Sequence, residues 1–122
     1  MKQRNKGWLF FLVSGLALSA CEEALEKPID NDQVILRAPG DGVVVNAGNQ
    51  IFYWDTLMAA KKYELEIVTP SFDAMALLIV DTTIAKNQLS FSLPVGHYQW
   101  RVRAKNNSTT SRYSATRKLI IQ

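Results

Sequence analysis

One run of strictly alternating residues constrains the fold of this chain more than any other feature. In the run His97–Asn106, apolar and polar residues take turns without a break. The apolar positions are Tyr98, Trp100, Val102 and Ala104, and the polar positions are Gln99, Arg101, Arg103 and Lys105. Side chains of a β-strand point to opposite faces with a period of two, whereas a helix would spread these residues around all its sides. The run therefore predicts a half-buried β-strand, covered on its apolar face by the rest of the chain.

Shorter runs of strand-like sequence recur between turn-forming residues. Tyr63–Thr69 and Gln88–Leu93 alternate cleanly, and Leu77–Asp81 is a continuous apolar run. Further strands are expected at the start of Val34–Gly42, at Gln50–Asp55 and at Ser114–Gln122, with Val43–Val45 as an edge piece and Thr82–Asn87 as a turn. About seven short strands and no convincing helix predict an all-β fold, an antiparallel sandwich over residues 34–122.

Residues 1–20 have the pattern of a secretory signal peptide. Lys2, Arg4 and Lys6 precede an apolar run of about 13 residues, too short to span a bilayer core, which takes about 20. The end of the run, Leu18–Cys21, reads LSAC and resembles the lipobox of bacterial lipoproteins. The resemblance implies that Cys21, the only cysteine in the chain, is acylated and anchors the protein in a membrane.

Residues 21–33 are expected to form an acidic tether between the lipid and the folded domain. The acids Glu22, Glu23 and Glu26 follow Cys21 closely. This short acidic run resembles the export signal that sends some Gram-negative lipoproteins to the cell surface. The resemblance implies an outer-membrane protein exposed on the cell surface; a plain solvated linker is the alternative, with the protein in the periplasmic leaflet.

The charge balance argues against a nucleic-acid partner. The whole chain has 14 basic and 11 acidic side chains. Loss of the three basic residues in the signal peptide leaves 11 of each, so the mature side chains sum to zero. A nucleic-acid binder needs a surplus of positive charge to displace counterions from phosphates.

Aromatic residues within the predicted strands carry a resemblance to the fibronectin type III domain, an immunoglobulin-like sandwich. They are Trp54, Tyr63 and the pattern Tyr98-x-Trp100-x-Val102-x-Ala104, preceded by Pro94. The resemblance implies that Tyr98 is a corner tyrosine whose hydroxyl bonds to nearby backbone. It also implies a scaffold for adhesion, spacing or binding.

The sequence lacks the residues of a catalytic or metal site. It has one histidine, His97, no nucleophile-elbow serine motif and no clustered Cys and His for zinc. The carboxylates of Glu64 and Glu66 point out from one strand, where Arg101 and Arg103 are expected opposite them as a structural charge ladder. We therefore expect no enzymatic activity, metal or cofactor.

Two sets of residues remain as candidate sites. Phe72 and Met75 lie in the loop Pro70–Ala76, where they either mark a partner site or fold down to cap the core. Thr56 and Thr82 follow aspartates in a pattern that resembles the O-glycosylation acceptor of some Gram-negative anaerobes; chance matches at ordinary strand ends are the alternative.

These observations predict a lipid-anchored, non-catalytic binding or adhesion module with a protein or glycan partner. A structural spacer that holds a partner away from the membrane is the alternative function. The chain as the N-terminal domain of a longer surface lipoprotein is a further alternative.

Overall fold

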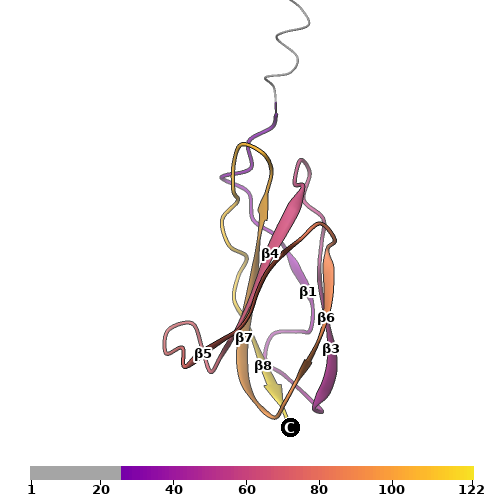
Figure 1. The fold of residues 1–122 in the computed structure, drawn as a ribbon, viewed down its shortest axis with the longest axis vertical. Coiled ribbons are helices and arrows are strands. Elements are labelled where there is room, and N and C mark those ends of the chain that lie inside the picture. Colours follow the sequence, from indigo (N-terminus) through magenta and orange to yellow (C-terminus); the bar gives the residue numbers. More distant parts are fainter. Residues whose placement is uncertain (1–25) are drawn as a thin grey trace, which may run out of the picture.

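A computed structural model describes residues 26–122, and every regular element in this part of the chain is a strand (Figure 1). The strands are β1 (Leu36–Ala38), β2 (Val43–Val45), β3 (Gly48–Trp54), β4 (Lys62–Thr69), β5 (Leu77–Ile84), β6 (Gln88–Leu93), β7 (Gly96–Lys105) and β8 (Arg117–Ile121). The predicted signal peptide and Cys21 lie outside the described residues.

The strands form two sheets that face each other across one core (Figure 1). One sheet has the order β1-β3-β6, and the other has the order β2-β8-β7-β4-β5. Every pairing between these strands is antiparallel except that of β2 with β8, which is parallel. The predicted β-sandwich is confirmed, and the expected edge piece Val43–Val45 is the short parallel strand β2.

The alternating run forms β7, which lies between β4 and β8 in the larger sheet. All four of its apolar side chains are buried in the core. The ring of Trp100 meets Phe52 of the other sheet edge-on, with 5.0 Å between ring centroids. Trp54 meets Tyr63 in the same way at 5.8 Å. These two aromatic pairs join the sheets, as expected for large rings, which favour edge-to-face packing.

The corner into β7 has the predicted tyrosine contact. The hydroxyl of Tyr98 donates a hydrogen bond to the carbonyl oxygen of Pro94 at 2.8 Å. Gly96 lies directly under this side chain, because a Cβ built on Gly96 would be 3.3 Å from the Tyr98 hydroxyl oxygen. Burial of the phenol raises the pKa of Tyr98. The role implied by the family resemblance is thus confirmed for Tyr98.

The expectation of a tether up to residue 33 is wrong for Glu26–Gln33. Ile29 is fully buried in the core cluster, although it precedes the first strand. Its backbone N–H donates to the hydroxyl of Thr109 at 2.9 Å, and Gln33 forms a parallel bridge with Arg112. The segment folds onto the sandwich because Ile29 and Val34 both bury apolar side chains there, which outweighs the acidity of the intervening residues.

Two other expected boundaries differ from the observed ones. β5 continues to Ile84, so Thr82 lies within a strand rather than in a turn. The last strand begins at Arg117 instead of Ser114. Before it, the hydroxyls of Ser111 and Ser114 accept hydrogen bonds from the backbone N–H groups of Ala104 and Val102. The two serine side chains thus take backbone N–H groups near the C-terminal end of β7. The regular ladder of backbone hydrogen bonds between β7 and the last strand therefore starts only at Arg117.

The run Leu77–Asp81 is a strand, but its first residues are not buried. β5 is the last strand of the larger sheet, so its outer edge has no neighbouring strand among the described residues. Leu77 is 61% exposed and Leu78 is 47% exposed, whereas Val80 is 8% exposed. The predicted strand is confirmed, and its edge position leaves its beginning in solvent.

Candidate interaction surface

The outer face of the larger sheet carries the predicted charge ladder. In the register of β4 with β7, Glu64 is opposite Arg103 and Glu66 is opposite Arg101. Arg101 bonds Glu66 at 2.8 Å, and Glu64 pairs with both Arg103 and Lys105. Burial acts to raise the pKa of Glu64, but hydrogen bonds from Arg103 and Lys105 outweigh it and hold the pKa below its usual 4.5. The carboxylates are therefore committed to structure, as expected.

Two aromatic rings enclose the Arg101 guanidinium on this face. Its central carbon lies 4.0 Å from the ring centroid of Phe72 and 3.9 Å from that of Tyr113. Arg103 also lies over the Tyr113 ring, at 4.5 Å. Such cation–π contacts are worth about 0.5–2 kcal/mol each, depending on exposure. The sequence did not predict a role for Tyr113, because it lies in the loop before β8, where no strand alternation indicates its direction.

Phe72 covers the outer face of the sheet rather than the core. The backbone N–H of Phe72 donates to the Gln99 side-chain carbonyl at 2.9 Å, which fixes its loop over β7. Val68, opposite Gln99 in the register, is fully buried yet lies outside the core cluster. Phe72 does not cap the core: its ring is half-buried and lies against the Arg101 guanidinium, outside the core cluster, and a partner role for it stays a prediction.

Met75 is exposed and continues into the exposed start of β5. Met75 is 50% exposed, and with Leu77 and Leu78 it forms what we call the β5 apolar edge. β5 contains no lysine or proline, the residues that usually protect a sheet edge, and its one charge is Asp81. The two residues of the predicted partner loop therefore differ. Met75 belongs to an exposed apolar surface, whereas Phe72 is half-buried against Arg101.

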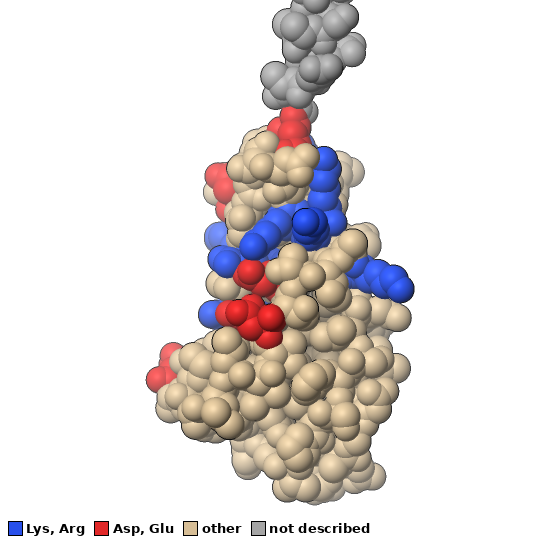
Figure 2. Space-filling view, in the orientation of Figure 1, with Lys and Arg blue, Asp and Glu red and all other residues tan. Residues whose placement is uncertain are grey.

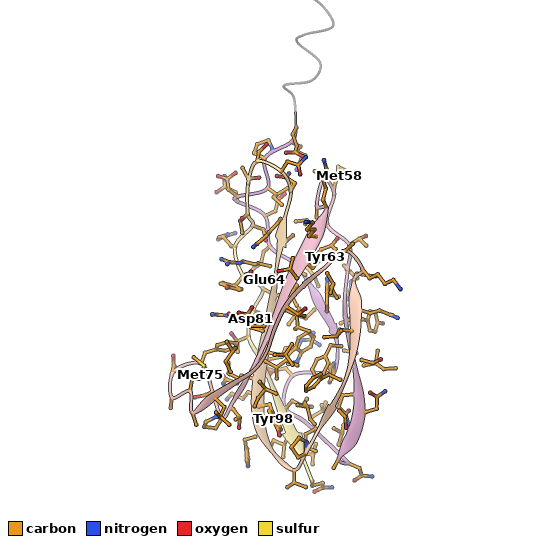
Figure 3. All side chains as sticks on the ribbon, in the orientation of Figure 1. Met58, Tyr63, Glu64, Met75, Asp81 and Tyr98 are labelled. Carbon is orange, nitrogen blue, oxygen red and sulfur yellow. The ribbon has the colours of Figure 1, made fainter. Side chains whose placement is uncertain are left out.

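Several long stretches of the sequence carry few or no charged residues. Residues 42–54, 87–100 and 119–122 contain no Lys, Arg, Asp or Glu, and residues 67–80 contain Asp73 alone. On the face that Figure 2 shows, most acids and bases lie towards the end where the described chain begins, and the rest of that face carries few charges. Met75 lies in the lower part and Met58 at the upper end (Figure 3). Because few charges lie at the end of this face away from the described N-terminus, apolar contacts are the main means of binding there.

The two candidate glycosylation residues lie on different elements. Thr56 is exposed in the loop after β3, next to Asp55, whose carboxylate accepts two hydrogen bonds from Arg37 at 2.8 and 2.7 Å. The bonds from Arg37 lower the pKa of Asp55. Thr82 is half-buried within β5, opposite Leu65 of the core-facing row. Of the two hydroxyls, Thr56 is the accessible one.

The described residues assemble no metal-binding cluster. No group of three or more His, Cys, Asp or Glu side chains within residues 26–122 is placed to hold a metal ion. His97 is exposed at the start of β7 and uses its backbone carbonyl to accept a 2.6 Å hydrogen bond from Thr69. In the same part of the chain, no helix has the length and apolarity to cross a membrane.

The arrangement of the strands is similar to that of fibronectin type III domains among solved structures. No family model matches the chain, and no curated protein matches it. Among solved structures, a fibronectin type III domain of the human KIAA0970 protein superposes with a TM-score of 0.58 at 14% identity, covering 84% of this chain and 81% of that one. The fold is fibronectin type III-like.

Two other solved structures have the same likeness. The fibronectin type III-like protein from Clostridium thermocellum has a TM-score of 0.51 at 16% identity, covering 73% of this chain and 88% of its own. The domain of human fibronectin type III domain containing protein 3 has a TM-score of 0.53 at 12% identity, covering 75% and 86%. At these identities the fibronectin type III-like fold is shared, and function must be argued from the surface.

Proposed function

We propose that this protein is a lipid-anchored, non-catalytic binding module of a Gram-negative cell envelope, and that it contacts its partner through the β5 apolar edge. The observation that carries the proposal is the exposure of Met75, Leu77 and Leu78 together, at the free edge of the larger sheet. Acyl chains on Cys21 supply the membrane anchor, and the acidic residues after it direct the protein to the cell surface, with the periplasmic leaflet as the alternative.

The chemistry of the edge favours a protein partner over a glycan. An edge strand offers a row of backbone N–H and C=O groups that an extended segment of another protein can pair with. Exposed leucines beside that row give apolar contacts for alternate side chains of the added strand. A glycan has no such backbone, and the aromatic rings that stack on sugars are absent from the β5 apolar edge.

A non-catalytic role agrees with how the reactive groups are used. Glu64 and Glu66 are paired with arginines on a flat sheet face, and His97 has no carboxylate bonded to it among the described residues. General acid–base catalysis needs a positioned group within reach of a bound substrate. Binding is therefore the role that this surface supports.

A spacer is the second candidate, favoured by the shape of the sandwich. The described chain begins at one end of the long axis, and its C-terminal residue lies at the opposite end (Figure 1). This arrangement would hold a following component away from the membrane. A spacer needs no exposed apolar edge, so the two roles respond differently to changes there.

Substitution at the edge distinguishes binding from spacing. Residues 21–122 are produced without the signal peptide and with Cys21→Ser, which makes the chain soluble. This chain and the same chain with Leu77→Gln and Leu78→Gln are screened against surface glycans and envelope proteins. The matched control is Ile51→Gln with Tyr53→Gln, because these exposed side chains, 55% and 43%, lie on the other sheet. We expect the edge variant to lose binding at least about tenfold, a loss of about 1.4 kcal/mol, while the control retains it. Binding that survives in the edge variant would favour the spacer.

A further inference from the structure

The end of the sandwich where the described chain begins is built around the first residues of that chain. We call this end, formed by Glu26, Lys27 and the loops 55–61 and 106–110, the N-terminal pole. The Glu26 carboxylate accepts a 2.6 Å hydrogen bond from the Ser108 hydroxyl and pairs with Lys61 at 3.2 Å. The Asn106 side-chain amide donates to the carbonyl oxygens of Lys27 and Ala59 at 2.8 and 3.2 Å. Both loops thus hold the chain at this pole.

These contacts limit the distance between the N-terminal pole and an anchor on Cys21. Because Glu26–Gln33 are docked on the domain, only residues 22–25 lie between Cys21 and the pole. Five Cα–Cα steps span at most about 18 Å, even when fully extended. A ten-residue strand such as β7 is about 34 Å long. The domain is therefore held within about half its own strand length of the acylated residue, and always by the same pole.

The side chains at the N-terminal pole suit the polar surface of a bilayer. Met58 is 77% exposed at the tip of the loop 55–61, which is the highest exposure of any large apolar side chain in the described residues. The loop is fixed below Met58 by a 3.0 Å hydrogen bond from the backbone N–H of Leu57 to the Tyr63 hydroxyl. Lys62, directly after this loop, is exposed, and a lysine at such a place extends its ammonium group among headgroups while its stem covers apolar surface.

We infer that the N-terminal pole lies against the headgroup layer of the membrane that holds the anchor, with Met58 in contact with lipid. The inference rests on the proposed acylation of Cys21 and adds an orientation to it. The long axis then runs away from the bilayer, and the β5 apolar edge lies towards the far end, accessible to a partner (Figure 3). The N-terminal pole faces the lipid surface and not another protein, because residues 22–25 are too few to leave room for a folded protein between the pole and the membrane.

Two single-cysteine variants test the orientation. Acylation consumes the Cys21 thiol, so a dye that reacts with thiols labels only Met58→Cys or Val95→Cys in the anchored protein. Val95 is the matched control, since it is also an exposed apolar side chain, at 69%, in the turn before β7 at the other end of the sandwich. Each acylated variant is placed in phosphatidylethanolamine–phosphatidylglycerol vesicles with an environment-sensitive dye at the new cysteine.

We expect the dye at position 58 to shift to shorter wavelength in vesicles and to lose fluorescence when the lipids carry a headgroup spin label. The dye at position 95 should keep the spectrum it has in detergent-free buffer and should not be quenched. Equal responses at the two positions, or a larger response at position 95, would overturn the orientation while leaving the anchor intact. Mass spectrometry of the same samples separates the two claims, because an unmodified Cys21 would overturn the anchor and the orientation together.

Discussion

At the scale of single residues, two tryptophans define the core. Trp54 and Trp100 are fully buried, and neither indole N–H meets a hydrogen-bond acceptor among residues 26–122. An unpaired buried donor costs about 1–3 kcal/mol. Their retention in the sandwich therefore depends on the apolar area of the rings, which each bury about 150–250 Å². Size and ring packing, rather than polar contacts, explain why the aromatic pattern of the sequence identified these positions.

Trp100→Ala tests this account of the core. Truncation of a large buried aromatic residue costs about 3–5 kcal/mol, a large share of the about 5–15 kcal/mol by which a domain is stable. Trp100→Phe should cost less, because it keeps a ring and removes the unpaired N–H. Denaturant melts of the soluble mature chain measure both, with the exposed Tyr53→Ala as control. A loss below about 1 kcal/mol for Trp100→Ala would mean that Trp100 does not hold the sheets together.

At the scale of elements, alternation predicted some strands well and others poorly. β4 and β7 bury one face and expose the other, so parity alone placed Glu64 and Glu66 with Arg103 and Arg101. For β5 the apolar run predicted a strand but not its place in the sheet, because such a run does not show whether a strand is central or at an edge. Pairing order decides the exposure of Leu77 and Leu78, and no local pattern contains that order.

The sequence was least informative where non-local contacts decide the structure. Ile29 is a lone apolar residue between Pro28 and Asp30, yet it is buried in the core, and its backbone N–H bonds the distant Thr109. The ring of Tyr113, in the loop before β8, lies against Arg101 and Arg103 of β7. Neither the contact of Ile29 across 80 residues nor that of a loop residue leaves a periodic signal for a single sequence to reveal.

The pairing of β4 with β7 predicts how stability depends on pH. The pKa of Glu64 is lower in the folded protein than its usual 4.5, so its ion pairs stabilise the fold above that value. This contribution is lost as the pH falls through the lower, folded pKa. Glu64→Gln should reduce the free energy of unfolding by about 0.5–1 kcal/mol at pH 7 and flatten its fall below about pH 4.5.

Denaturant melts from pH 7 to pH 3 measure both effects of Glu64→Gln. Asp55→Asn is the control, because its pair with Arg37 is more exposed and should contribute less. If Glu64→Gln kept the wild-type pH dependence, the ladder on the outer face would not contribute to stability.

At the scale of the whole molecule, most charged residues on the face that Figure 2 shows lie towards one end of the long axis. The described chain begins at that end, and β5 lies towards the other one (Figure 1). With an anchor at Cys21, one sandwich meets two environments, a lipid surface at one end and a partner near the other. The fold supplies the rigid distance between them, and both proposed contacts depend on the anchor.

The most direct test of the account is metabolic labelling of Cys21. Cells that express the wild-type chain or Cys21→Ser are fed a clickable fatty acid, and the protein is purified and its label is measured. We predict strong label on the wild type in the membrane fraction, and no label on Cys21→Ser, which stays uncleaved or is wrongly cleaved. Equal label on the two proteins would contradict acylation of Cys21.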